Sequence, residues 1–190
     1  ANKGTFCKAL VVAGCANYTG AAILASMAAA RVGTGLVSLA CCASLHPIFA
    51  SRLLETTFLP LPEDEPGYLG LKASPPLLDA VPNYSTVLLG PGLGQRPATA
   101  AFVLQTVGHL ALPCVMDADG LNALATRDQW WRGIPAGSVL TPHPGEFARL
   151  AHLTVPEVQA DRLGIAIRCA AEWGQVVVLK GANTVVAAPD

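Results

Sequence analysis

The stretch Thr86-Val87-Leu88-Leu89-Gly90-Pro91-Gly92-Leu93-Gly94 sets the pattern on which the fold depends. Its first four residues predict a short buried strand. The glycines that follow have no Cβ, so they let the backbone turn sharply and present its N–H groups to a ligand. The pattern matches neither the Gly-x-Gly-x-x-Gly dinucleotide fingerprint nor the Walker phosphate loop. Taken alone, it is also compatible with a tight turn before a helix that begins at Ala98.

Three further apolar runs end in the same way, with a polar or glycine-rich loop directly after the strand. These loops are Asp117-Ala118-Asp119, Thr141-Pro142-His143-Pro144-Gly145-Glu146 and Lys180-Gly181-Ala182-Asn183-Thr184. In an open α/β sheet a ligand lies outside the carboxyl ends of the strands. We therefore expect the loops to converge on one crevice of nucleotide size.

The hydrophobic pattern outside these loops predicts alternating strands and helices. Strands are expected at 9–13, 36–40, 86–89, 114–116, 138–140 and 176–179, and helices at 20–32, 98–107, 121–125 and 154–173. Residues 59–82 are interrupted by prolines and acids and predict irregular or edge structure. A turn at 181–183 returns the chain as a strand at 184–188. The prediction is an α/β fold of three layers, a mostly parallel sheet with helices on both faces, in one domain over residues 1–190.

The composition favours a small-molecule ligand. Of the 190 residues 52% are apolar and 13% charged, about half the usual charged share. Such a surface predicts a homo-oligomer or a missing part of the domain. The net charge of −1, without a Lys/Arg cluster, argues against nucleic acid or an anionic membrane as partner. The longest apolar stretch, 20–30, is too short to span a bilayer, and the N-terminus does not match a signal peptide.

The six cysteines are scattered without a Cys-x-x-Cys pair. Most lie in apolar runs, which is typical of inert core thiols in a reducing compartment, so we expect a cytoplasmic protein. Cys15 differs because it lies in the loop after the first strand.

Asp117 and Asp119 lie where a strand ends and a helix begins. Paired carboxylates there suit a ligand of Mg²⁺ and phosphate, but either residue could instead cap the following helix. Asn122, three residues beyond Asp119, is expected on the same side of the helix and could hydrogen-bond the ligand or the loop.

The segment around His143 is the most specific single motif, because two prolines hold a histidine at the end of a strand. His143 could donate to a substrate oxygen or transfer a proton. Glu146 could orient His143 or accept from the next helix, or it could only complement the helix dipole.

Lys180 follows a four-residue apolar strand, so its ammonium is expected at the same sheet edge, where phosphate is its natural partner. Gly181 would allow close approach and Thr184 would offer a hydroxyl. The alternative is a solvated lysine in a hairpin.

Read together with Lys3-Gly4 and the loop of residues 14–22, these motifs resemble those of the NAD(P)H-hydrate dehydratase family, a branch of the ribokinase-like superfamily. The resemblance covers essentially the whole chain in the correct order. It implies a repair enzyme, a lyase, that uses ADP or ATP with Mg²⁺ to dehydrate the S epimer of hydrated NADH or NADPH. The family is thought to phosphorylate the hydroxyl on the hydrated ring, after which phosphate leaves and the double bond returns.

The resemblance also assigns residues. Those implied to bind the hydrated dinucleotide or support its pocket are Ala21 or Ala22, Gly92, Gly94, Asp117, Asn122, His143 and Glu146. Those implied to contact the adenine nucleotide are Lys180, Gly181, Ala182, Asn183 and Thr184. No metal ligand is assigned.

One family motif has no counterpart before Asp190. It is a Gly-x-Gly-Asp segment that supplies an anion hole and the catalytic base, so no catalytic residue is assigned and we expect this chain to be an incomplete, inactive form of the domain. Two other functions stay open: a small-molecule kinase of the same superfamily, and a nucleotide-binding protein without catalysis. A stable phosphorylated product would indicate the kinase, and inorganic phosphate would indicate the lyase.

Overall fold

The computed structural model describes residues 7–190, so the Lys3-Gly4 motif lies outside the described residues. The strands in this range are β1 (Lys8–Val12), β2 (Leu36–Cys42), β3 (Thr57–Leu61), β4 (Thr86–Leu89), β5 (Cys114–Met116), β6 (Val139–Leu140), β7 (Val176–Leu179) and β8 (Val185–Ala187). They form one sheet in the order β3-β2-β1-β4-β5-β6-β7-β8. Every neighbouring pair is parallel except β7 and β8. The predicted α/β fold with a mostly parallel sheet is confirmed.

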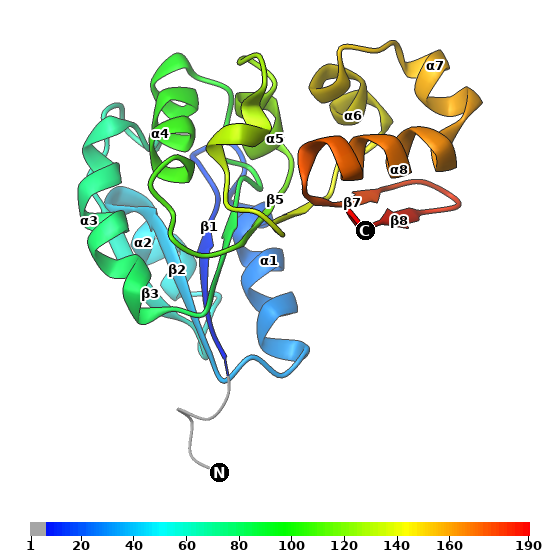
Figure 1. The fold of residues 1–190 in the computed structure, drawn as a ribbon. Coiled ribbons are helices and arrows are strands. Elements are labelled where there is room, and N and C mark those ends of the chain that lie inside the picture. Colours follow the sequence, from blue (N-terminus) through cyan, green and yellow to red (C-terminus); the bar gives the residue numbers. More distant parts are fainter. Residues whose placement is uncertain (1–6) are drawn as a thin grey trace.

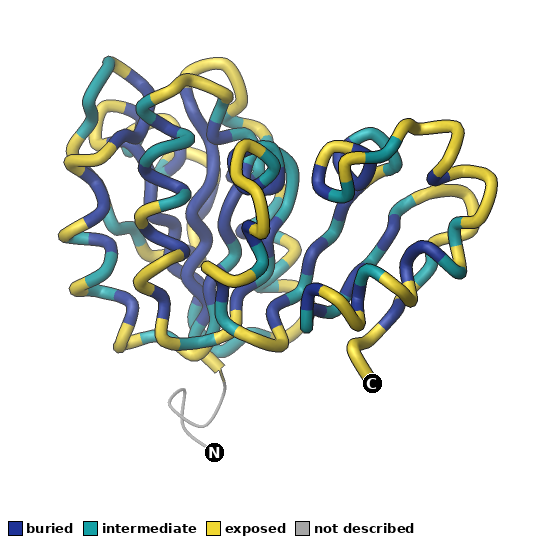
Figure 2. The backbone as a smooth tube through the Cα atoms, turned by 45° about the horizontal axis from the view of Figure 1, so that its top comes forward, coloured by how far each residue is buried: buried dark blue, intermediate teal, exposed yellow. Residues whose placement is uncertain are grey.

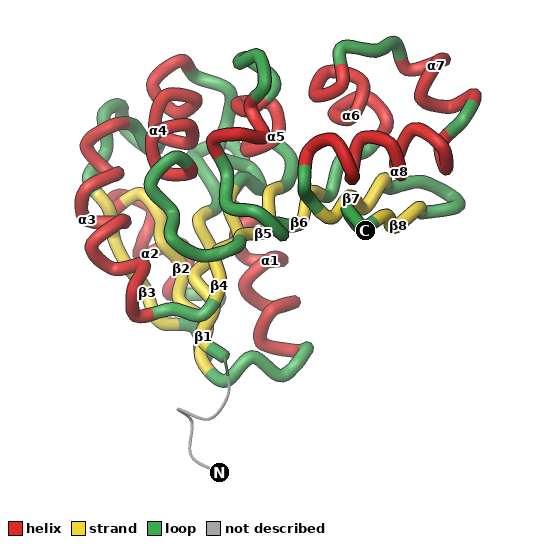
Figure 3. The backbone as a smooth tube through the Cα atoms, in the orientation of Figure 1, coloured by secondary structure: helices red, strands yellow, loops and turns green. Residues whose placement is uncertain are grey.

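The helices connect these strands in sequence. They are α1 (Thr19–Arg31), α2 (His46–Ala50), α3 (Ser74–Ala80), α4 (Pro97–Val107), α5 (Asp119–Leu124), α6 (Pro144–Ala151), α7 (Val155–Ala160) and α8 (Arg162–Trp173). Figure 3 shows them around the sheet. Among the described helices, none has the length and hydropathy needed to cross a membrane.

The direction of the strand order decides which face each helix covers. The chain moves one way from β1 to β3 and the other way from β4 to β8. Right-handed crossovers therefore place α1 and α2 on one face and α3, α4, α5 and α8 on the other. Figure 1 shows α3 and α4 on the opposite side of the strands from α1. Helices thus cover both faces, as predicted.

Strands β4 to β7 are covered unequally. Their alternate residues Val87, Leu89, Cys114, Met116, Leu140, Val177 and Leu179 are buried, whereas Thr86, Leu88, Val115, Val139, Val176 and Val178 are only half-buried. Figure 2 shows the buried strands running between more exposed helices. Nearly all of these positions are apolar, which is typical of parallel strands packed on both faces.

Residues 59–82 are partly as predicted. Strand β3 lies at one edge of the sheet and pairs only with β2. It contains Pro60, which a sheet tolerates at an edge because proline has no N–H to donate. The expectation of no helix was wrong: α3 begins at Ser74 with two prolines in its first turn, where helical N–H groups need no partner within the helix.

The single helix predicted at 154–173 is wrong, because the structure has two helices separated at Asp161. Its φ of −144° and ψ of 63° are not helical, and its side chain accepts a hydrogen bond from the Gly164 N–H as the cap of α8. The predicted capping box of Thr154 and Glu157 is confirmed at the start of α7. An aspartate can therefore end one helix and cap the next within a continuous apolar pattern.

Candidate functional site

The predicted loops meet at the carboxyl edge of the sheet. In each loop, the residue directly after the strand donates its backbone N–H to a carbonyl. For three loops this carbonyl belongs to the last residue of the neighbouring strand, and for the fourth it belongs to the loop that follows the neighbouring strand β6. These bonds run from Gly90 to Val12, Asp117 to Leu89, Thr141 to Met116 and Lys180 to Pro142, with N···O distances of 3.1, 3.2, 3.1 and 2.8 Å. The sheet's hydrogen-bond pattern continues into the loops and sets their spacing.

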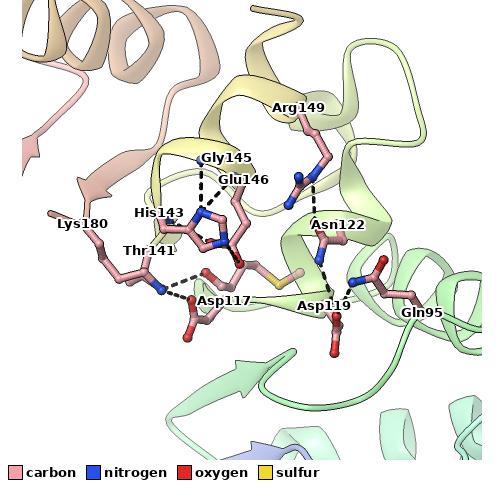
Figure 4. Close-up of polar contacts among 11 residues, drawn as sticks. Gln95, Asp117, Asp119, Asn122, Thr141, His143, Gly145, Glu146, Arg149 and Lys180 are labelled. Carbon is pink, nitrogen blue, oxygen red and sulfur yellow. Dashed lines mark hydrogen bonds and ion pairs between the residues drawn. The ribbon is translucent and has the colours of Figure 1, made fainter. Parts of the chain in front are cut away.

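Lys180 and Asp117 form an ion pair at this edge. The Lys180 Nζ donates to Asp117 Oδ1 at 2.7 Å, and the side chains are 41% and 27% exposed. Figure 4 shows the pair beside Thr141 and His143. Lysine is therefore at the sheet edge, as expected, but its partner in the structure is a carboxylate. Such a partly exposed pair contributes about 1 kcal/mol or less to stability.

Ala118 directs the two neighbouring carboxylates to different partners. Its φ of 50° lies in the left-handed region, which is uncommon for a residue with a side chain. Asp117 binds Lys180, whereas Asp119 accepts from the Gly94 N–H at 2.9 Å. Neither caps α5 through its side chain, because the cap position is Ala118 and it has no side-chain cap bond. The capping alternative is thus wrong.

Asp119 begins a hydrogen-bonded chain between the glycine-rich loop and α6. Its Oδ1 accepts from Gln95 Nε2 at 3.0 Å and from Asn122 Nδ2 at 3.4 Å. The Asn122 Oδ1 accepts from Arg149 Nε at 3.0 Å. Asn122 therefore belongs to this series of hydrogen bonds and does not contact the ion pair of Lys180 and Asp117 (Figure 4). Sequence reasoning missed Gln95 and Arg149, for which the local pattern gives no signal.

His143 is the N-cap of α6. Its Nδ1 accepts from the N–H groups of Gly145 and Glu146 at 3.0 and 3.3 Å, so the neutral ring carries its proton on Nε2. The buried Glu146 accepts from the His143 N–H at 2.8 Å and has Oε1 3.3 Å from Nε2. Glu146 thus holds both the backbone and the ring of His143. The capping role was missed, although His143-x-x-Glu146 has the spacing of Thr154-x-x-Glu157.

The glycine-rich loop packs against the start of α1. A Cβ on Gly92 would lie 2.7 Å from the Ala21 Cβ, and the φ values of Gly92 and Gly94 are 65° and 84°. Of the two predicted alanines, only Ala21 borders the crevice. Ala22 is fully buried in the core, with its Cβ 2.8 Å from where a Gly14 Cβ would lie.

An open hollow of about 640 Å³ lies beside these loops on the α1 side of the sheet. It extends from Asp117 and Thr141 past Pro91 to the exposed side of α1. Its size is typical of a small-molecule site. Within residues 7–190 no group of three His, Cys, Asp or Glu side chains is arranged to hold a metal ion.

The loop of residues 180–184 is organised by Arg162, which sequence reasoning also missed. Its Nη2 donates to the carbonyls of Leu179, Lys180 and Asn183 at 3.0, 3.2 and 3.1 Å. The Thr184 hydroxyl donates to the Gly181 carbonyl at 3.1 Å. Residues 181–184 are exposed.

Comparison with known proteins identifies relatives of this chain. A family model described as NAD(P)H-hydrate dehydratase matches residues 9–190. The bifunctional NAD(P)H-hydrate repair enzyme of Moorella thermoacetica is 42% identical over 189 residues, which are 100% of this chain and 36% of that protein. The ADP-dependent (S)-NAD(P)H-hydrate dehydratase of Bacillus subtilis is 36% identical over 192 residues, covering 100% of this chain and 63% of that protein. This chain thus spans less than two thirds of the length of either relative.

Solved structures show the same fold. The crystal structure of the Bacillus subtilis ADP/ATP-dependent NAD(P)H-hydrate dehydratase, co-crystallised with ATP/Mg²⁺, has a TM-score of 0.79 and 33% identity, and the match covers 100% of this chain and 63% of that one. A ribokinase-like superfamily protein of Enterococcus faecalis has a TM-score of 0.81 at 22% identity, covering 99% and 62%, and supports the fold alone. From the match over residues 9–190, this chain belongs to the NAD(P)H-hydrate dehydratase family.

Proposed function

We propose that this chain takes part in the ADP- or ATP-dependent dehydration of the S epimer of NAD(P)H hydrate to NAD(P)H, a lyase reaction of metabolite repair. The observation that carries the proposal is the convergence of the glycine-rich loop, His143 and the Lys180 loop at one sheet edge. The Bacillus subtilis relative is named for this reaction.

The proposed binding sites divide this edge in two. Ala21, Gly92, Gly94 and His143 would border the hydrated dinucleotide, and residues 180–184 would contact the adenine nucleotide. Lys180 would move from Asp117 to a phosphate oxygen, because an ammonium binds phosphate as a point charge. The Nε2–H of His143, which lies 3.3 Å from Glu146 Oε1, would exchange that carboxylate for a substrate oxygen, while Nδ1 stays occupied by the start of α6.

The residues at this site could hold Mg²⁺ only together with the phosphate oxygens of a bound nucleotide. Mg²⁺ commonly takes one or two carboxylates and completes its shell with water and phosphate oxygens. Asp117 is the partly exposed carboxylate at the strand end, so we assign it the protein side of this contact. The ion would neutralise charge on the transferred phosphoryl group.

The chemistry requires a phosphoryl group to pass from the nucleotide to the ring hydroxyl. The C–O bond then breaks, the oxygen leaves with phosphate, and a proton is lost from the neighbouring carbon as the double bond forms. Phosphate is a far better leaving group than hydroxide. We assign the base for that proton to none of the described residues.

The test is an incubation of S-NADPH hydrate with ADP and Mg²⁺, followed by measurement of NADPH absorbance and inorganic phosphate. Both the 190-residue chain and the full product of its source gene are assayed. NADPH and phosphate in equal amounts from the full product support the proposal. A stable phosphorylated substrate would indicate a kinase instead, and binding by both forms without turnover would indicate a non-catalytic protein.

We also propose that the protein is a cytoplasmic homo-oligomer. The supporting features are Leu24 of α1 and Val32 directly after that helix, which are 70% and 83% exposed, and cysteines that are all free over residues 7–190. Sedimentation of the chain and of a Leu24→Glu variant tests the association: a monomer in both cases would contradict it. Cell fractionation tests the location.

A further inference from the structure

Arg162 occupies the space that a side chain at position 181 would need. A Cβ on Gly181 would lie 2.7 Å from Arg162 Nη2, 3.1 Å from Cζ and 3.2 Å from Nη1. The backbone of Gly181 does not have the positive φ that requires glycine elsewhere in the chain. The glycine at this position is therefore explained by the guanidinium packed against it and not by backbone strain.

The same guanidinium binds the carbonyls at the end of β7 and in the turn that follows. One nitrogen, Nη2, serves Leu179, Lys180 and Asn183, and Nη1 donates to Gln159 Oε1 at 3.2 Å. These contacts hold the turn in one conformation through its backbone. Arginine suits this role because its fork of donors is planar and stays charged.

The direction of the carbonyls fixes the direction of the N–H groups. In a trans peptide the C=O and the following N–H point to opposite sides, and the described residues contain no cis peptide. The Leu179 carbonyl faces Arg162, and the next N–H, that of Lys180, donates to Pro142 on the other side. By the same geometry the N–H groups of Gly181 and Thr184 point away from Arg162.

We propose that Arg162 is a positioning residue for the loop of residues 180–184. This inference rests on the proposed role of that loop in binding ADP or ATP. Arg162 turns the loop carbonyls toward α8, so that the N–H groups of Gly181 and Thr184 and the ammonium of Lys180 are arranged for an anion. Preorganisation of this kind improves affinity, because the ligand does not have to order the loop on binding.

The experiment measures binding of ADP with Mg²⁺, and separately of NADPH, by calorimetry on the 190-residue chain and its variants. Arg162→Ala is expected to weaken ADP binding about tenfold and leave NADPH binding within about twofold. Arg162→Lys is expected to recover part of the loss, because an ammonium offers three donors without the fork. The control is Arg168→Ala, since exposed Arg168 of the same helix only pairs with Asp161 at 3.4 Å.

Gly181→Ala tests the same idea without removing the charge. Its methyl group would displace the guanidinium, so we expect a similar loss of ADP affinity and little further loss in the double variant. Amide hydrogen exchange across residues 180–184 is expected to accelerate in Arg162→Ala and Gly181→Ala but not in Arg168→Ala. This readout does not depend on a nucleotide.

Unchanged ADP affinity in Arg162→Ala would overturn the positioning role, as would an equal loss of ADP and NADPH affinity, which would indicate a general structural role. If the unsubstituted chain binds no ADP, the proposed function of the loop fails and the positioning role fails with it. If the chain binds no ADP and amide exchange across residues 180–184 is still faster in Arg162→Ala, Arg162 is a purely structural residue.

Discussion

The capping box of His143 and Glu146 makes a quantitative prediction about stability. In Glu146→Ala the His143 N–H loses its carboxylate acceptor at 2.8 Å, at a position where the glutamate is 5% exposed. Loss of a hydrogen bond to a charged group costs about 1.5–3 kcal/mol, and loss of a helix cap typically costs about 1 kcal/mol. Because these two estimates describe overlapping contacts, we expect a loss of roughly 2–3 kcal/mol in the free energy of unfolding.

The contact between Glu146 Oε1 and His143 Nε2 adds little to this estimate. The histidine side chain is 53% exposed, and water replaces a lost partner at such a position. Glu146→Gln keeps the shape and one acceptor oxygen, so it is expected to lose less than Glu146→Ala. The difference between the two variants then reports the contribution of the charge.

Urea unfolding followed by circular dichroism measures the effect. With a slope of about 2 kcal/mol per molar urea, the midpoint of Glu146→Ala falls by roughly 1–1.5 M. The chain contains its own matched control, since Glu157→Ala removes the same kind of cap from the exposed box of α7. A Glu146→Ala midpoint no lower than that of Glu157→Ala would refute the reasoning from burial.

Three further predictions concern single groups. Gly90→Ala is expected to prevent stable folding, because φ is 131° and a Cβ would lie 1.9 Å from a backbone carbonyl oxygen of the neighbouring loop; a soluble variant with an unchanged unfolding midpoint would contradict this. The hydroxyl and N–H of Thr154 lower the pKa of Glu157 below 4.5. The unsubstituted protein should therefore be more stable than Thr154→Ala above that pH and lose this advantage as the carboxylate is protonated in acid, which NMR titration and acid unfolding can check. Burial, and then the charge of a nearby glutamate, raise the pKa of Cys42 to about 12. A thiol reagent near neutral pH should therefore label exposed Cys7 in the native protein and reach Cys42 only after unfolding. Equal labelling rates for the two cysteines would contradict the burial of Cys42.

The sheet was predictable because its signal is local. Strands such as 86–89 and 176–179 are short apolar runs bounded by glycine or polar loops, and their predicted bounds agree with the structure. The order of parallel strands then places all the loops at one edge by topology alone. Helix α3 and the break at Asp161 could not be predicted in this way, since both depend on how prolines or a carboxylate satisfy the N–H groups of a helix start.

The site was less predictable, because its contacts join residues far apart in the chain. The pairing of Lys180 with Asp117 spans 63 positions, and the bonds from Arg162 to the Lys180 loop span 17 to 21. No local pattern encodes such contacts. The capping role of His143 is different: its spacing to Glu146 was visible, but histidine is not among the usual capping residues, so the signal was not recognised.

The contacts at the carboxyl ends of the strands differ in how much they contribute to holding the loops. Four backbone bonds set the spacing of the loops without any side chain, whereas the Lys180 and Asp117 pair is partly exposed and contributes little to stability. The two charged groups are therefore available to exchange partners at small cost to the fold. Asp119, Arg162 and Glu146 act differently, because each binds backbone N–H or carbonyl groups of a loop. Under the proposed function, ligand contact falls to the exposed pair and the positioning of the loops to these three residues.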